Sequence, residues 1–115
     1  MCRILVVDDN DDLREILVEM LSGEGHDVCA APDGAQALHL AAQHKPSLVL
    51  IDRFLPDMDG RDLAEKLRRS LGDQSFLVLV TGDTSARGDG PFDAMLGKPF
   101  DPSQLGKLVA NLPSC

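Results

Sequence analysis

The chain has 115 residues, a length typical of one domain built around a single core. Hydrophobic residues make up 43% and charged residues 26%, which is the composition of a globular protein and not of a disordered one. The net charge of −8 argues against nucleic acid or an anionic membrane as the main partner, because both attract clusters of lysine and arginine.

Targeting and zinc-binding patterns are missing from the sequence. No apolar run approaches the roughly 20 residues that a membrane-spanning helix needs. The first residues, "MCRILVVDD", contain one basic residue followed by acids, unlike a secretory signal. The three cysteines show no C-x-x-C spacing, which argues against a zinc site. We therefore expect a cytoplasmic protein without zinc.

Short apolar runs alternate with helical patterns along the whole chain. The predicted segments are, in chain order, strand 3–7 ("RILVV"), helix 11–23, strand 27–31 ("DVCAA"), helix 34–44 ("GAQALHLAAQH"), strand 47–52 ("SLVLID"), a turn at 56–60 ("PDMDG"), a helix with Leu63, Leu67 and Leu71 on one face, strand 76–80 ("FLVLV"), a weak strand 93–97 ("DAMLG") and a closing helix from Pro102 with Leu105, Leu108, Val109 and Leu112 on one face.

The first predicted helix shows how such a segment is recognised. Its apolar residues are spaced as one face of an amphipathic helix: Leu13, Ile16, Leu17, Met20 and Leu21. Asp11 and Asp12 lie at its start, where we expect them to cap the helix and to suit the positive end of its dipole. Gly23 and Gly25 are expected to end it.

Alternation of apolar strands with helices predicts a parallel sheet that is covered on both faces, with right-handed crossovers. The sequence shows no repeats and no linker, so we expect one domain over residues 1–115. The chain ends a few residues after the last predicted helix, so we do not expect an attached output module.

Chemically reactive residues follow the predicted strands at the point where each strand ends. They are Asp8 and Asp9 after the first strand, Asp52 after the third, Thr81 after the fourth and Lys98 after the fifth. In open α/β sheets, ligands bind outside these carboxyl ends. Each residue alone also fits a plain turn or a helix start, but all five together favour one shared site.

Three carboxylates in one crevice repel one another, by about 4 kcal/mol for two charges roughly 4 Å apart at an effective dielectric constant near 20. A hard divalent cation removes that repulsion, and Mg²⁺ takes carboxylates, water and phosphate oxygens. A lysine and a hydroxyl beside them suit a phosphoryl group. Because "DDNDDL" and not a glycine-rich loop follows the first strand, a nucleotide is not expected, and an aspartate could itself carry the phosphoryl group.

Four stretches, "ILVVDDN", "LVLIDRFLPDMDG", "VTG" and "KPFDP", resemble the receiver domain of bacterial two-component response regulators, of which the chemotaxis regulators are examples. The resemblance covers nearly the whole chain, and "LPDMDGRDLAEKLR" with "KPFDPSQL" is similar to receivers attached to hybrid histidine kinases. It implies a flavodoxin-like, doubly wound, five-stranded parallel sheet of order 2-1-3-4-5. It also implies phosphotransfer from a phosphohistidine on a partner kinase.

The resemblance implies a role for each residue that matches the motifs. Asp52 is expected to be the phosphoacceptor. Asp9 is expected to bind Mg²⁺ (or Mn²⁺) directly, Asp8 to support the metal largely through water, and the backbone carbonyl of Phe54 to complete the protein's share of the metal shell, which includes Asp52.

The remaining motif residues follow the last two strands. Thr81 and Lys98 are expected to bind the phosphoryl oxygens, and Pro99 to follow a cis peptide bond. Family members usually carry an aromatic residue or histidine three residues before the lysine, where it reports phosphorylation together with the threonine. That switch position holds Met95 here, which can repack but has neither a ring nor a hydroxyl.

A second departure from the family is the length of the connection between the last two strands. Seventeen positions separate Thr81 from Lys98, fewer than receivers need for a fourth helix. Between Asp83 and Pro91 no apolar helical pattern exists, and each glycine there costs a helix about 1 kcal/mol relative to alanine. We expect the fourth helix to be shortened or missing, and residues 83–91 to form a mobile loop.

The function expected from these features is that of a signalling phosphoacceptor and not of an enzyme with an outside substrate. The expected partner is a histidine kinase or a histidine phosphotransfer domain, with no nucleic acid and no membrane. We expect the chain to be a monomer or weak homodimer that signals by protein contact.

Two alternative functions stay open. A haloacid-dehalogenase-type phosphatase also uses an aspartate and Mg²⁺, but needs D-x-D after the first strand, where position 10 is asparagine. A degenerate receiver would act as an unphosphorylated scaffold.

Overall fold

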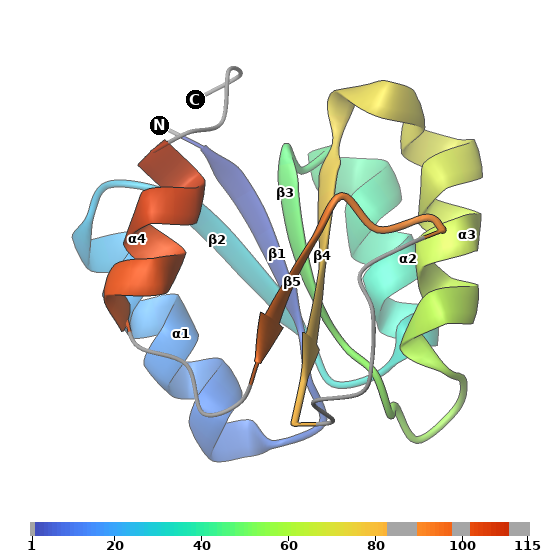
Figure 1. Ribbon diagram of the computed structural model, residues 1–115, viewed down its shortest axis with the longest axis horizontal. Coiled ribbons are helices and arrows are strands. Elements are labelled where there is room, and N and C mark those ends of the chain that lie inside the picture. The colour runs from blue at the N-terminus through green and yellow to red at the C-terminus, as the bar shows by residue number, and fades with distance from the viewer. Residues whose placement is uncertain (1, 83–89, 98–101, 111–115) are drawn as a thin grey trace.

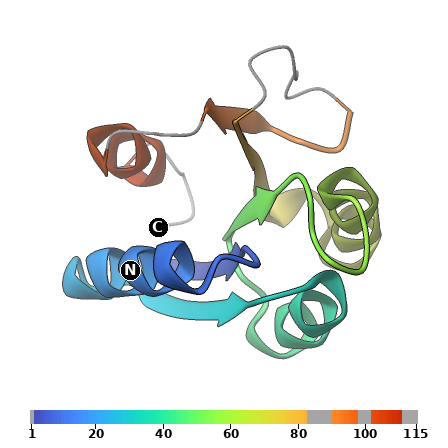
Figure 2. The same ribbon diagram turned by 90° about the horizontal axis from the view of Figure 1, so that it is seen from below.

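The computed structural model describes residues 2–82, 90–97 and 102–110, and it places a central sheet between two pairs of helices (Figures 1 and 2). The strands are β1 (Arg3–Val7), β2 (Asp27–Ala31), β3 (Leu48–Asp52), β4 (Phe76–Thr81) and β5 (Ala94–Gly97). The helices are α1 (Asp11–Gly23), α2 (Gly34–His44), α3 (Gly60–Leu71) and α4 (Pro102–Ala110), with a short 3-10 turn, η1 (Gly72–Gln74).

All strand pairs are parallel, and the order across the sheet is β2-β1-β3-β4-β5. This order confirms the predicted flavodoxin-like fold. The chain leaves β1 toward β2 on one side and returns to β3 on the other, so the strand order reverses beside β1. The carboxyl ends of β1 and β3 therefore lie next to each other at the point where ligands bind in such sheets.

Successive residues of β1 point to opposite faces of the sheet, which gives the domain two apolar layers. Ile4 and Val6 belong to a cluster that includes residues of α1 and α4, and Leu5 and Val7 belong to one that includes residues of α2 and α3. Figure 2 shows α1 and α4 on one side of the sheet, and α2 and α3 on the other. Strands buried on both faces explain why their sequences are continuous apolar runs.

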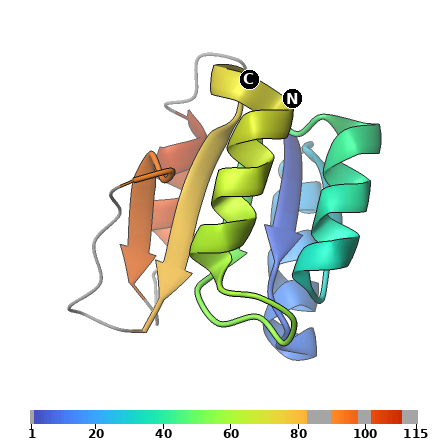
Figure 3. The same cartoon turned by 90° about the vertical axis from the view of Figure 1, so that its right-hand side faces the viewer.

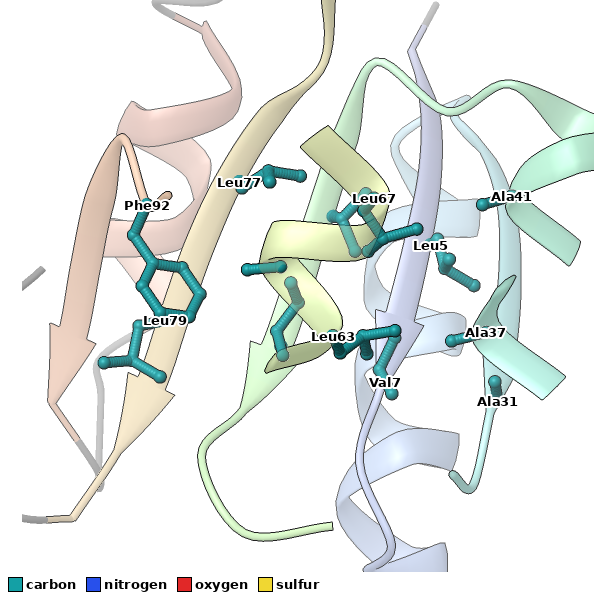
Figure 4. Close-up of a cluster of buried hydrophobic side chains, with 13 residues drawn as sticks. Leu5, Val7, Ala31, Ala37, Ala41, Leu63, Leu67, Leu77, Leu79 and Phe92 are labelled. Carbon is teal, nitrogen blue, oxygen red and sulfur yellow. The ribbon is translucent and has the colours of Figure 1, made fainter. Parts of the chain in front are cut away.

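The connection between β4 and β5 was predicted to lack a full helix. Among its described residues, Gly82 and 90–93, the structure has no helix. Phe92, only 6% exposed, packs into the cluster beneath α3 and lies beside β4 near Leu77 and Leu79 (Figure 4). One aromatic side chain thus supplies apolar cover for this part of the sheet. Most of the predicted mobile loop, residues 83–89, lies outside the described residues.

The start of α1 differs from the prediction in two respects. Its N-cap is Asn10, whose side chain accepts a hydrogen bond from Leu13 N, so the expected capping by Asp11 and Asp12 was wrong. Both aspartates lie in the first turn. Ile16, predicted as part of the apolar stripe, is 58% exposed. It lies at the edge of the stripe, whereas Leu17 and Leu21 at the centre of the stripe are buried.

Arg68, in the last turn of α3, ties three segments together at the end of the sheet opposite the carboxylates. Its Nη1 donates to the carbonyls of Gly72 (3.1 Å) and Ser75 (2.9 Å). Its Nη2 donates to Pro91 O (2.9 Å) and to Asp93 Oδ2 (2.7 Å). Because Asp93 Oδ2 also accepts from Leu77 N, the arginine links the end of α3 and the entries to β4 and β5.

We expect Arg68→Ala to lower the free energy of unfolding by about 1–3 kcal/mol, because three backbone carbonyls and a carboxylate lose a charged donor. Arg68→Lys should recover less than half of the loss, since an ammonium group cannot reach the same four acceptors. Urea unfolding measures both. Arg69→Ala, at the exposed neighbouring position, is the matched control and should change stability by less than about 0.5 kcal/mol. An equal loss in both alanine variants would show that the arginine network does not stabilise the fold.

Within the described part of the chain, no helix combines the length and the apolar character that crossing a membrane requires.

Candidate metal and phosphoryl site

Three carboxylates meet at the carboxyl edge of the sheet, as the sequence predicted. One oxygen each from Asp8, Asp9 and Asp52 lies within 4.8 Å of the others. Asp8 is buried at 3% exposure, Asp52 is half-buried and Asp9 is exposed. The cluster therefore has one side inside the protein and one open to solvent, so that a small ligand can reach it.

Asp8 is held at three points. Its N–H donates to Ala31 O of β2 (3.1 Å), which continues the hydrogen bonding of the sheet beyond the last residue of β1. Its Oδ1 accepts from Asn10 N (2.9 Å), and its carbonyl accepts from Arg14 Nη1 (2.8 Å). Arg14 also forms an ion pair with Asp11. The backbone and the carboxylate of Asp8 are thus both fixed before any ligand binds.

Asp52 ends β3, and its position depends on a close approach by the start of α3. Gly60 N donates to Arg53 O at 2.6 Å. A Cβ at position 60 would overlap the carbonyl oxygen of Asp52 and would lie 3.0 Å from Ile51 Cγ2 and 3.1 Å from Arg53 Cα. Only glycine allows the chain to turn back against the end of β3 at this distance.

Thr81 is the last residue of β4 and is 3% exposed. Its neighbour Val80 pairs with Asp52 in the sheet, so Thr81 lies one residue beyond the level of Asp52 on the adjacent strand. The structure thus brings Thr81 to the same edge as the carboxylates. Lys98 and Pro99, predicted to bind phosphoryl oxygens and to follow a cis bond, lie outside the described residues.

Met95, predicted at the switch position, lies on β5 and is 38% exposed. It pairs with Leu79, whereas Thr81 pairs with Gly97, so two residues along the strand separate Met95 from the level of the threonine. Its role in a switch stays a prediction.

The loop after Asp52 runs from Arg53 to Asp59 and closes on itself. Phe54 forms an isolated antiparallel bridge with Asp59, and Arg53 Nε lies 3.6 Å from Asp59 Oδ2. The guanidinium group of Arg53 is 5.4 Å from the centre of the Phe54 ring, within the range of a cation–π contact. Phe54 is nevertheless 65% exposed, so a large apolar residue lies on the surface two positions after Asp52.

Asp57 is a functional candidate that the sequence reasoning missed, because "PDMDG" was interpreted only as a turn. Its two carboxylate oxygens accept hydrogen bonds from Gly34 N (2.9 Å) and Ala35 N (3.0 Å), at the start of α2. The hydrogen bond from Gly34 above all, and that from Ala35, hold the pKa of the Asp57 carboxyl below its usual range. The contact spans 23 residues of sequence, so no local pattern signals it.

The residues present fit a hard divalent cation. All three converging side chains are carboxylates, and carboxylate oxygens are the ligands that Mg²⁺ prefers. Two such charges within 4.8 Å of each other repel strongly unless a cation lies near them.

Comparison with known proteins identifies the class. Residues 4–110 match the family described as the response regulator receiver domain, and the chain belongs to this family. The DNA-binding response regulator MtrA of Mycolicibacterium smegmatis is 39% identical over 113 residues, covering 90% of this chain and 46% of that protein. The response regulator MprA of a Mycobacterium species is 38% identical over 114 residues, covering 96% of this chain and 48% of that protein.

Solved structures agree on the fold. The chemotaxis protein CheY4 of Vibrio cholerae has a TM-score of 0.88 at 26% identity, covering 97% of this chain and 98% of that one. The response regulator TrrA of Thermotoga maritima, solved in complex with Mg(2+)-BeF, has a TM-score of 0.87 at 31% identity, covering 97% of this chain and 99% of that one. The chain is therefore a receiver domain of two-component signalling, a phosphoacceptor module and not a conventional enzyme.

The expectation that nucleic acid plays no part was wrong at the level of the protein class. The MtrA relatives are named DNA-binding response regulators, and the chain spans about half the length of the curated relatives it matches. The inference failed because it used the net charge of −8, which describes this chain alone. The net charge of a receiver does not predict the charge of the remaining half of its longer relatives.

Proposed function

We propose that residues 1–115 form one receiver domain in which Asp52 takes a phosphoryl group from a phosphohistidine on a partner histidine kinase. The observation that carries this assignment is the meeting of Asp8, Asp9 and Asp52 within 4.8 Å at the carboxyl edge of a β2-β1-β3-β4-β5 sheet. Among these three, Asp52 is the carboxylate at the end of β3, and it is half-buried between a buried and an exposed neighbour.

The chemistry is an in-line displacement. A carboxylate oxygen of Asp52 forms a bond to phosphorus, the bond from phosphorus to the imidazole nitrogen of the donor breaks, and its electron pair goes to that nitrogen. The buried hydroxyl of Thr81 would donate to a phosphoryl oxygen. Lys98, which follows Gly97 in the sequence, would neutralise the charge of the phosphoryl group. Water would later attack the same phosphorus, the bond from phosphorus to the Asp52 oxygen would break with its electron pair returning to the carboxylate, and inorganic phosphate would leave. The chain would thus catalyse its own phosphorylation and dephosphorylation only.

Asp8, Asp9, Asp52 and the backbone carbonyl of Phe54 would hold Mg²⁺ or Mn²⁺, which supplies positive charge to the carboxylates and the phosphoryl oxygens when bound. Support comes from the oxygen-only donor set and from the related TrrA, solved with Mg(2+)-BeF at 31% identity. The main-chain positions of Asp8 and Asp52 are fixed by hydrogen bonds to β2 and by the approach of Gly60. These residues would therefore present ligands without a large rearrangement.

The phosphorylated domain would act by contact with another protein surface, and a cytoplasmic location, where receivers meet their kinases, belongs to the same proposal. Both follow from membership of the family and not from any feature of this chain's surface.

Incubation of the protein with acetyl phosphate and Mg²⁺ tests the proposal. We expect up to one phosphate per chain, released by hydroxylamine as an acyl phosphate should be, and located at Asp52 by peptide mass spectrometry. A chelator in excess of Mg²⁺ should reduce the rate at least about tenfold. Absence of label with acetyl phosphate and with purified phosphohistidine donors would contradict the proposal and favour a scaffold.

A further inference from the structure

The loop that follows the proposed phosphoacceptor is docked on a helix from another part of the chain. Asp57, in the middle of this loop, accepts from both Gly34 N (2.9 Å) and Ala35 N (3.0 Å), the first two backbone donors of α2. Figure 3 shows the loop below α3 at the same end of the molecule as the start of α2. A carboxylate at a helix N-terminus is favoured by the unpaired N–H groups and by the helix dipole.

Met58 makes a second contact between the same two segments. A Cβ at Gly34 would lie 2.5 Å from Met58 Sδ, 2.6 Å from its Cε and 2.7 Å from its Cγ. The side chain of Met58 thus occupies the space that any residue other than glycine would need at the start of α2. Met58 also packs against the cluster that contains the buried residues of α2 and α3. Two consecutive residues therefore fix the loop to α2, one by hydrogen bonds and one by packing.

The docked part of the loop is connected rigidly to the end of β3. Leu55 N donates to Met58 O (3.2 Å), which closes the turn that contains Asp57. Phe54 is bridged to Asp59, and Gly60 N donates to Arg53 O (2.6 Å). A movement of Asp57 away from α2 would therefore be transmitted through a short, hydrogen-bonded unit to the main chain directly after Asp52.

We propose that Asp57 is a positioning residue that holds the backbone of Arg53 and Phe54, and with it the metal-binding carbonyl of Phe54, by anchoring the loop to α2. The inference rests on the proposed function, since it assigns to Asp57 a role in the same site. Through Asp57, the first turn of α2 influences the affinity of the site for Mg²⁺, although α2 itself supplies none of the proposed ligands. Hydrogen-bonded groups behind metal ligands affect metal affinity by roughly 10–100-fold in other proteins.

Comparison with Asp33 distinguishes two roles of Asp57: stabilising α2 alone, or also positioning the loop. Asp33 caps the same helix by accepting from Gln36 N (2.8 Å), a bond within the first turn of α2 that does not involve the 53–59 loop. Loss of either carboxylate removes hydrogen bonds from the first turn of α2. Only loss of Asp57 also releases the loop.

The test measures the Mg²⁺ dissociation constant by isothermal titration calorimetry, the rate of phosphorylation by acetyl phosphate, and the urea midpoint. Asp57→Ala is expected to weaken Mg²⁺ binding at least about fivefold and Asp33→Ala less than about twofold, with comparable losses of stability. Asp57→Asn should restore part of the affinity, because its amide oxygen can replace one of the two accepting carboxylate oxygens, whereas its NH2 group cannot accept from the other N–H group. In metal-free protein, hydrogen exchange of the Leu55 and Gly60 amides, which donate to Met58 O and Arg53 O, should speed up in Asp57→Ala and not in Asp33→Ala.

Gly34→Ala tests the same contact by a change in α2 instead of a change in the loop. Alanine is the better helix former, but its methyl group must push Met58 away, so Mg²⁺ binding should weaken even if the helix itself is stabilised. Unchanged Mg²⁺ affinity in both Asp57→Ala and Gly34→Ala, or an equal weakening in Asp33→Ala, would overturn the positioning role. Wild-type protein that is labelled at Asp52 in that same experiment would leave the proposed function intact. Wild-type protein that binds no Mg²⁺ and takes no label would contradict both.

Discussion

Asp52→Asn is expected to abolish acyl phosphate formation. The carboxamide keeps the size of the side chain but is not a nucleophile of comparable strength, because its nitrogen lone pair is delocalised and its oxygen carries no charge. The variant should stay folded, since the packing of β3 between β1 and β4 does not depend on the charge. Intact-mass spectrometry after incubation with acetyl phosphate and Mg²⁺ measures the effect, and circular dichroism verifies the fold.

Asp9→Asn and Asp8→Asn are the matched controls for this experiment, because each also replaces one carboxylate of the cluster with an amide. Both should slow labelling by at least about tenfold through weaker metal binding, and higher Mg²⁺ concentration should recover part of the rate, whereas no concentration should rescue Asp52→Asn. Labelling that survives in Asp52→Asn but is lost in Asp8→Asn would identify a nucleophile after the first strand, as in the phosphatase alternative. Asn10 stands where the D-x-D pattern of the phosphatase needs an aspartate, and its side chain caps α1. This agrees with the receiver and not with the phosphatase.

Gly60→Ala is expected to have the second-largest effect, on stability and on phosphorylation together. The added methyl group would overlap the carbonyl oxygen of Asp52, which is backbone and cannot rotate away, so β3 and α3 must separate. Overpacking of this kind costs about 1–3 kcal/mol and occasionally more. Because the displaced atoms belong to Asp52 itself, the rate of labelling should fall by roughly tenfold or more even in the fraction that is folded. Urea unfolding and the acetyl phosphate assay measure the two effects.

Gly106→Ala, the same substitution inside α4, provides a control with the opposite sign. Beyond its own helix, a Cβ at Gly106 would meet no atom of the described residues within 4 Å, so alanine should raise the free energy of unfolding by about 0.5–1 kcal/mol through helix propensity and leave labelling unchanged. A loss of stability in Gly60→Ala no larger than about 0.5 kcal/mol would mean that the loop yields easily and that the close approach does not position Asp52.

Much of the fold could be predicted from the sequence because local patterns carry it. "RILVV" and "DVCAA" coincide with β1 and β2, and "GAQALHLAAQH" with α2, since continuous apolar runs and capped helical stripes are local signals. The convergence of Asp8, Asp9 and Asp52 was also predictable, because the carboxyl ends of parallel strands share one edge.

Other features of the site and of the fold depend on contacts that no local pattern encodes. Asp57 meets α2 across 23 residues, and Arg68 finds three of its four acceptors on backbone carbonyls, which every residue has. Arg68 looks in the sequence like an ordinary surface cation near a helix end. The prediction that Ile16 is buried was wrong for another reason. Residue spacing defines an apolar stripe, but the angle at which the helix meets the sheet decides which edge of that stripe is buried.

The two apolar layers of the sheet are completed at different times when the chain is synthesised. Among the described residues, the last buried member of the cluster on the side of α2 and α3 is Phe92, whereas the cluster on the side of α1 also includes Leu96, Leu105 and Val109. Leu105 is fully buried in the cluster that contains Ile4 and Val6, so this apolar layer keeps an open face until α4 leaves the ribosome. A nascent chain that stalls before α4 would present that face to chaperones or to other chains, since incomplete domains expose the surface that folding would bury.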